Sequence, residues 1–254
     1  AADPPRARGK PGKADRPRPP LPDVGAFVWR LNDEGEWEGC EVIAVHTGDR
    51  TMDLKHTRGE WCVLKGVARD DVLIAAEAAD KRAEVVAYVA AHDLGATLEA
   101  MFANDEDEGA SIMDPRTCTT LYLSFKDLSA AGAMPPAAAW QWVPELKKVN
   151  LTCATLPANG LEDVLAGCAH LTDLHLQGAD FDQCEGGFPG VVDQIAAAPI
   201  GTEHPLDLSL DGATALRAGD VFSRLIAGCP RLRVLAVVQC DLESLPAELG
   251  TACR

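Results

Sequence analysis

Long apolar runs are missing from this sequence of 254 residues, although its hydrophobic content of 47% is ordinary for a globular protein. No stretch approaches the roughly 18 to 20 apolar residues that a membrane-spanning helix needs, and no charged-then-apolar signal peptide stands near the N-terminus. We therefore expect a soluble, cytoplasmic protein that does not act at a membrane.

Motifs of catalysis and of metal binding are also missing. The sequence contains no Gly-rich phosphate loop, no Gly-x-Ser-x-Gly elbow and no His-Glu-x-x-His. The nearest Cys/His group is Cys168, His170 and His175, and it lacks a fourth ligand at zinc-site spacing. The acidic run NDEDEG at 104–109 fails as a calcium loop, because its twelfth position is Pro115 rather than Glu. We predict no enzyme, no cofactor and no metal.

Charge is divided unevenly along the chain. Residues 1–22 carry six Lys/Arg against two Asp/Glu and hold seven prolines, whereas the remainder carries 17 basic against 37 acidic side chains. The first segment is predicted to be an extended basic arm, either a solvated linker or a segment that lies along an acidic partner. The acidic remainder disfavours direct nucleic-acid binding, which depends on neutralising phosphates with basic side chains. We expect proteins as partners.

Residues 23–75 consist of short alternating runs separated by turn residues, which predicts a small antiparallel barrel. The runs AFVWRL, WEGCEVIAVH, RTMDLKH and WCVLKG resemble the Tudor-like branch of SH3-like barrels. Many members of that branch hold methylated Lys or Arg in an aromatic cage. The alternative is a purely structural or protein-docking barrel, in which Trp29 and Trp61 belong to the core. The resemblance assigns a possible barrel site to Trp37, Met52 and His56.

Residues 76–112 repeat apolar side chains at helical spacing, which predicts two short helices or one kinked helix. The stretch from Val85 to Phe102 resembles the LisH motif, a helical hairpin that dimerises, and this resemblance implies a possible homodimer. The alternative is an amphipathic cap that shields the first unit of the following repeats. The positions that match the motif directly are Tyr88, Thr97, Glu99 and Ala100.

Residues 113–254 fit the template L-x-x-L-x-L-x-x-N/C-x-L five times, at spacings of 25 to 34 residues. The phrases LAGCAHL at 165–171 and IAGCPRL at 226–232 are nearly the same. This pattern resembles the cysteine-containing subclass of leucine-rich repeats, known from substrate-binding arms of F-box ubiquitin-ligase adaptors. The predicted fold is an α/β leucine-rich-repeat solenoid, preceded by a small all-β SH3-like barrel and a helical segment. The five units begin at Cys118, Leu146, Leu171, Pro205 and Leu232.

Each such unit buries its leucines on a short parallel strand and returns through a helix, so the residues that flank the leucines line a concave face. This face is expected to start with an aromatic residue, turn polar and acidic, and end apolar. That gradient favours a protein partner, with the convex side or the ends as the alternative binding surface. The predicted partner-binding residues are Tyr122, Lys148, Asn150, Asp173, His175, Gln177, Asp207, Ser209, Asp211, Val234 and Val238.

These patterns predict a non-catalytic protein-protein interaction scaffold or adaptor, which is a structural subunit of a multi-subunit complex. The LisH resemblance implies a cytoskeletal or ciliary assembly. Two alternatives stay open at this point. One is a substrate-recognition subunit of a ubiquitin ligase, and the other is a reader of methylated Lys or Arg through the barrel.

Overall fold

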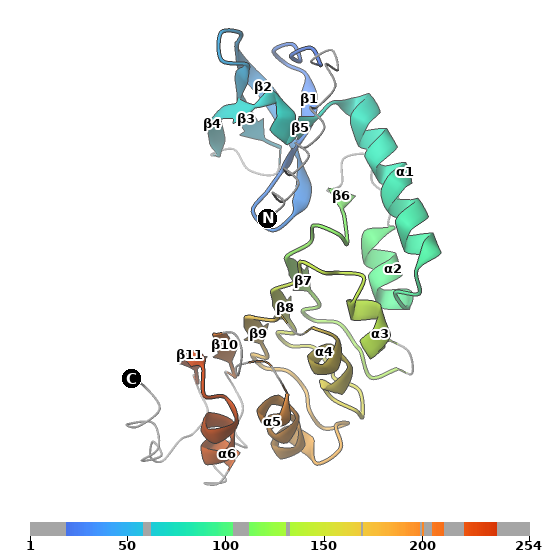
Figure 1. The fold of residues 1–254 in the computed structure, drawn as a ribbon, viewed down its shortest axis with the longest axis vertical. Helices are drawn as coiled ribbons and strands as arrows, with labels where there is room; N and C mark the ends of the chain where they lie inside the picture. The colour runs from blue at the N-terminus through green and yellow to red at the C-terminus, as the bar shows by residue number, and fades with distance from the viewer. Residues whose placement is uncertain are drawn as a thin grey trace, which may run out of the picture.

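The computed structural model describes residues 19–57, 62–103, 112–130, 133–168, 170–198, 200, 205–210 and 221–237. The described chain forms two β-sheets, and two helices, α1 and α2, precede the strand β6 from which the chain passes into the second sheet (Figure 1). Some predicted features lie outside the described residues, namely residues 1–18 of the arm, Trp61, the acidic run at 104–109, Asp211 and Val238.

The first sheet has the strand order β4-β3-β2-β1-β5, and β6 pairs with the N-terminal end of β2. Its pairs are antiparallel, as expected for strands joined by short turns. Alternate side chains bury a small core of Val28, Cys40, Val42, Met52, Leu54 and Val72. The strands are β1 (Phe27–Leu31), β2 (Glu36–His46), β3 (Thr51–His56), β4 (Val63–Ala68), β5 (Val72–Leu73) and β6 (Ile112–Met113).

A buried arginine fixes the last residues of the arm to this sheet. Arg69 begins a 3₁₀ turn (Arg69–Asp71), and its side chain is almost fully buried. Its guanidinium donates to the carbonyl oxygens of Pro20 and Val72, at 2.8 and 2.9 Å, and to the carboxylate of Glu77. Arg50 donates to the carbonyl oxygen of Pro19 at 2.6 Å. These hydrogen bonds hold Pro19 and Pro20 against the first sheet.

Helices α1 (Ala75–Ala91) and α2 (Ala96–Phe102) lie between β5 and β6 along the chain. Glu77 accepts a hydrogen bond from the backbone N–H of Ile74, which caps the start of α1. The apolar positions of both helices are buried in the larger core of the molecule, together with the leucines of the second sheet. The LisH-like segment thus uses its apolar face inside the chain. A homodimer through its remaining, exposed side is a prediction that a mass measurement of the isolated protein tests.

The second sheet is parallel, with its five strands in sequence order from β7 to β11. A helix follows each of the first four strands, and Figure 1 shows these helices along one side of the sheet. The central residues Leu121, Val149, Leu174 and Leu208 are almost completely buried. The elements are β7 (Thr120–Tyr122), α3 (Ala137–Trp140), β8 (Lys148–Asn150), α4 (Glu162–Gly167), β9 (Asp173–His175), α5 (Gly187–Ala197), β10 (Leu206–Ser209), α6 (Val221–Gly228) and β11 (Leu232–Ala236).

The two sheets meet at a buried charge cluster centred on Asp114, which directly follows β6. Arg116 donates two hydrogen bonds to its carboxylate, at 2.9 and 2.8 Å, and Lys81 of α1 lies 2.5 Å away. Arg116 also binds Glu84 of α1 and lies over the ring of Tyr88. The predicted boundary between residues 112 and 113 falls inside β6, so the chain returns to the first sheet before it enters the second.

Candidate functional site

The outer face of the parallel sheet carries the predicted central row. Tyr122, Asn150, His175, Ser209 and Ala236 are register partners on successive strands. The adjoining row runs through Thr120, Lys148, Asp173, Asp207 and Val234 in the same register. Both rows lie on the outer face because successive side chains of a strand point to opposite faces of the sheet, and the leucines between them point into the core.

Polar side chains in the middle of the face hold one another in place. Asn150 accepts hydrogen bonds from the backbone N–H and the hydroxyl of Thr152, at 3.0 and 2.6 Å. The hydroxyl oxygen of Thr152 lies 3.2 Å from the side-chain oxygen of Gln177. Asn150 and Gln177, both predicted site residues, therefore belong to one polar network whose geometry is fixed before a partner arrives.

The acidic character expected for the far half of the face is reduced by a basic side chain that the sequence prediction missed. Arg233, from the start of β11, donates to both carboxylate oxygens of Asp207, at 2.7 and 2.5 Å. The hydrogen bond to Asp207 raises the pKa of Arg233 above its ordinary value. Asp173 lies beside Lys148 in the register of β8 and β9. The two predicted acidic residues that the structure describes, Asp173 and Asp207, thus each have a basic neighbour.

Ser209 does not reach the surface, contrary to its predicted place on the binding face. Its side chain is 6% exposed, and its hydroxyl has no hydrogen-bond partner. The alternation of side chains along a strand predicts which face of the sheet a residue lies on, but it does not predict how far neighbouring residues cover that side chain. Ser209 is therefore excluded from direct contact with a partner.

Replacing Ser209 with alanine is expected to raise the free energy of unfolding by about 1 kcal/mol, because a buried hydroxyl without a partner is unfavourable. Urea unfolding followed by circular dichroism measures the change. The control is Ser129→Ala, because the Ser129 hydroxyl does donate to Asp127 and its loss should lower stability slightly. Destabilisation by Ser209→Ala would contradict the absence of a hydrogen bond.

The first sheet closes one end of this face. Tyr122, which is 40% exposed, donates to Glu34 at 2.7 Å, and the backbone N–H of Thr119 donates to the carbonyl oxygen of Glu34. This hydrogen bond, together with partial burial, raises the pKa of Tyr122 to about 12. Gly35 is required here, because a Cβ atom would lie 2.0 Å from the carbonyl oxygen of Thr117. The turn between β1 and β2 thus covers the edge of β7.

Phe125, just beyond β7, is a surface residue that the sequence prediction missed. It is 79% exposed, and its φ angle of 59° is in the left-handed region that favours glycine. The equivalent positions of the next two units are Cys153, with φ of 55°, and Gly178, with φ of 61°. The glycine in the third unit is the signal in the sequence that marks this position as left-handed.

The three residues of the possible barrel site are not brought together. Met52 is completely buried in the core of the first sheet, so it cannot contact a ligand. The Nε2 atom of His56 lies 2.8 Å from a carboxylate oxygen of Glu38 in β2, so the imidazole already contacts a side chain of the first sheet. Trp37 packs against the larger core and pairs with β6. An aromatic cage built from these residues is therefore not formed, because strand alternation sends Met52 inward.

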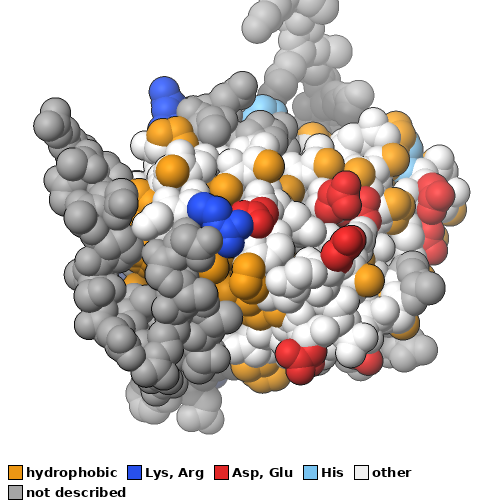
Figure 2. All heavy atoms as spheres, turned by 90° about the horizontal axis from the view of Figure 1, so that it is seen from below, with side chains coloured by type: hydrophobic (Ala, Val, Ile, Leu, Met, Phe, Trp, Pro, Cys, Tyr) orange, Lys and Arg blue, Asp and Glu red, His pale blue; other side chains and the backbone are white. Residues whose placement is uncertain are grey.

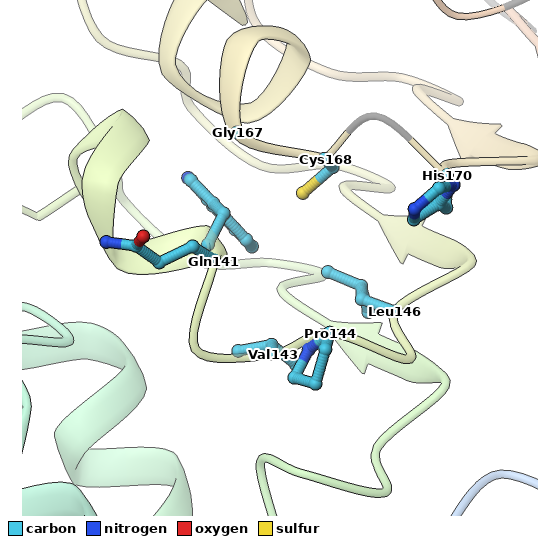
Figure 3. Close-up of a pocket in the computed structure, with 8 residues that line it drawn as sticks. Gln141, Val143, Pro144, Leu146, Gly167, Cys168 and His170 are labelled. Carbon is cyan, nitrogen blue, oxygen red and sulfur yellow. The ribbon is translucent and has the colours of Figure 1, made fainter.

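The described residues also form a hollow on the helical side, next to the ends of α3 and α4. Its volume is about 250 Å³, and its lining includes Trp140, Leu146, Cys168 and His170 (Figure 3). Burial raises the pKa of the Cys168 thiol to about 12, so this thiol stays protonated at neutral pH. The thiolate is the nucleophilic form of cysteine, so burial keeps Cys168 in its less reactive form.

No group of three or more His, Cys, Asp or Glu able to hold a metal ion occurs among the described residues. In the same part of the chain, no helix has the length and apolar character needed to cross a membrane. Comparison with protein-family models, curated proteins and solved structures found no match to this chain.

Proposed function

We propose that this protein is a non-catalytic interaction scaffold of the leucine-rich-repeat type, which acts as a structural subunit of a larger assembly. One observation carries the proposal, namely the in-register rows on the outer face of the parallel sheet, whose side chains are at least partly exposed except for the buried Thr120 and Ser209. The buried leucines beneath them make this face rigid, so a partner meets side chains that are already ordered. Pre-ordered side chains lower the entropic cost of association.

The composition of the face supports a protein as its partner. The rows combine an aromatic residue, amides, ion-paired charges and the exposed Val234 over five strands. A small molecule is held by a concave pocket that encloses it, whereas protein interfaces combine aromatic and Arg anchors with a polar rim. An extended face of mixed polarity fits the second description.

The LisH resemblance supports a cytoskeletal or ciliary assembly as the setting, and co-recovery with salt-extracted cytoskeletal particles tests this part of the proposal. A ubiquitin-ligase subunit is the alternative, and co-purification with cullin machinery would favour it. The reader hypothesis loses support, because Met52 lies in the core of the first sheet.

A double variant of the outer face, Lys148→Glu with Val234→Arg, tests the proposal. Both side chains stand in the same row, and Val234 is 48% exposed. We expect partner recovery from the native assembly to fall by tenfold or more, because like charges and a lost apolar contact each weaken an interface by about 1 kcal/mol or more. Lys65→Glu, an exposed lysine of β4, is the matched control and should leave recovery unchanged.

Cross-linking mass spectrometry on the wild-type assembly provides the second readout. Partner cross-links are expected from Lys126 and Lys148, which lie on or next to the outer face. Equal recovery of the partner with both variants, together with cross-links confined to the helical side, would refute the proposal.

A further inference from the structure

Phe125, which follows β7, has a left-handed backbone conformation that lowers the stability of the fold for a residue other than glycine. The fold requires this backbone geometry, since the N–H groups of Phe125 and Cys153 donate to the carbonyl oxygens of Thr152 and Gln177, at 2.9 and 2.8 Å. Gly178 fills the equivalent position of the next unit without steric strain. A non-glycine residue in this region is destabilised by about 1–2 kcal/mol. Phe125 is thus costly in its conformation and gains little from burial.

Phe125 is not isolated on the surface. Tyr122 is three residues away, so the two Cα atoms are at most about 11 Å apart. Among the described residues of the parallel sheet and its helices, these are the two exposed aromatic side chains, and the third large exposed apolar side chain is Val234 of β11. Tyr122 and Phe125 are thus two exposed aromatic side chains within three residues of each other at the β7 end of the sheet, and we call the two together the aromatic patch.

Acidic residues lie close to Tyr122. The Glu34 carboxylate accepts the hydrogen bond of Tyr122, and the backbone carbonyl of the neighbouring residue Asp33 faces the Thr119 hydroxyl. Glu36 is close enough to raise the pKa of Tyr122 further. Along the chain, the exposed Asp127 follows Phe125 by two residues, with the oppositely charged Lys126 between them. Aromatic rings among carboxylates are complementary to a basic segment that also contains proline, through stacking, cation-π contact and Coulomb attraction.

The chain itself contains a segment of that chemistry. We propose that residues 1–18 of the arm, which hold all six basic residues of the first 22, dock on the patch of Tyr122 and Phe125 of the same chain and occupy it until a partner displaces them. The acidic surroundings of the patch attract the arm, and the aromatic rings select its place. This inference goes beyond the proposed scaffold function, because the arm can dock whether or not the outer face binds another protein.

The point of attachment favours docking within one chain. Arg69 and Arg50 hold the carbonyl oxygens of Pro20 and Pro19, so the arm leaves from a fixed point on the first sheet, which itself contacts Tyr122. In a polyproline conformation 18 residues span roughly 55 Å, about the width of a protein of this size. A tethered segment within reach has an effective concentration near the millimolar range, which exceeds that of an arm from a second copy in dilute solution.

Acidic side chains also lie elsewhere on the surface, so the test must show that the basic arm binds near the aromatic patch and not at any exposed carboxylate. Figure 2 shows acidic side chains scattered over the end of the molecule seen from below. Glu185, and Asp193 of α5, are two exposed acidic residues far from the patch in sequence. Asp193 already pairs with Arg224. Charge alone would distribute the arm over many of these carboxylates, whereas the proposal confines it to those around the aromatic patch.

Zero-length carbodiimide cross-linking of the full chain tests the proposal. We expect Lys10 and Lys13 to link to Asp33, Glu34, Glu36 or Asp127. In an equal mixture of unlabelled and ¹⁵N-labelled protein, these links should join peptides of the same label. Phe125→Gly keeps the backbone geometry while removing the ring, and it should lower the yield of these links about tenfold, as expected for loss of one aromatic anchor.

Val86→Ala is the matched control, because it truncates an exposed apolar side chain of α1 that belongs neither to the outer face nor to the aromatic patch, and it should leave the yield unchanged. Three results would each overturn the proposal. They are an equal yield in Phe125→Gly, links spread evenly over Glu185 and Asp193, and links between light and heavy peptides. The last of these would assign the patch to the arm of a second copy.

Discussion

Replacing Gly167 with alanine is expected to lower the free energy of unfolding by about 3 kcal/mol, the upper part of the range for overpacked cores. A Cβ atom at Gly167 would lie 2.5 Å from the carbonyl oxygen of Ala137 and 2.6 Å from the Cβ of Trp140. Neither obstacle is the end of a flexible side chain, since one is backbone and the other anchors a buried indole. The clash is relieved only if α4 moves away from α3.

The same geometry occurs between α5 and α6, a second pair of neighbouring helices, which provides an internal comparison. A Cβ atom at Gly228, at the end of α6, would lie 2.3 Å from the Cβ of Ala196 in α5. The two glycines hold the same place in the phrases LAGC and IAGC, 61 residues apart. Gly228→Ala should therefore destabilise the protein through the same mechanism. The recurring sequence thus contains a glycine at the position where two neighbouring helices pack too closely for a Cβ atom.

Gly48→Ala is the control for this prediction. No other atom lies within 4 Å of a Cβ atom built at Gly48, and its φ angle is not in the left-handed region. Its effect should stay within about 0.5 kcal/mol, as for surface substitutions in general. Urea unfolding of the three variants measures the differences. A loss below about 1 kcal/mol in Gly167→Ala would show that α3 and α4 can separate at little cost.

The inner and outer sides of the parallel sheet follow from the leucine spacing alone. Leu121, Val149 and Leu174 fall at template positions and are buried, so strand alternation places Tyr122, Asn150 and His175 on the other side. The period of the repeats then aligns these residues across the sheet. Local periodicity is enough for this step, because alternation within each strand decides which side chains face the core.

The features that sequence reasoning missed depend on contacts between distant segments. The exposed ring of Phe125 reflects a left-handed turn that is visible only by comparison with Gly178. The depth of Ser209 depends on what covers the strand, and periodicity does not contain that information. Arg233 reaches Asp207 from the adjacent strand, 26 residues away. Met52 was assigned to a binding site by analogy with a family, and the actual register of β3 sends it into the core.

Asp114→Asn is expected to lower the free energy of unfolding by about 3 kcal/mol at neutral pH, because it breaks a buried, hydrogen-bonded charge cluster. The carboxylate is almost completely buried and binds both Arg116 and Lys81. Asparagine keeps the size of the side chain and can still accept the backbone N–H of Arg116. The variant therefore removes the negative charge but preserves most of the packing. It leaves the cations Lys81 and Arg116 close together at the junction between the two sheets.

The effect should depend on pH. Burial by itself would raise the pKa of Asp114, but hydrogen bonds from Arg116 and Lys81 outweigh it and hold the pKa below its ordinary value. A carboxyl group whose pKa is lower in the folded state contributes stability above its unfolded value of about 3.9, and this contribution is lost as the pH falls through the folded value. The difference between wild type and Asp114→Asn should thus be largest near neutral pH and shrink below about pH 4.

Glu84→Gln separates this buried effect from ordinary surface charge. Glu84 also binds Arg116, at 2.5 Å, but its side chain is 56% exposed, so water replaces the lost interaction. Its removal should cost less than about 1 kcal/mol. Denaturant unfolding of both variants from pH 3 to pH 7 makes the comparison. An Asp114→Asn effect no larger than that of Glu84→Gln, or one that does not change with pH, would mean that the junction is held by packing of α1 and β6 rather than by the buried carboxylate.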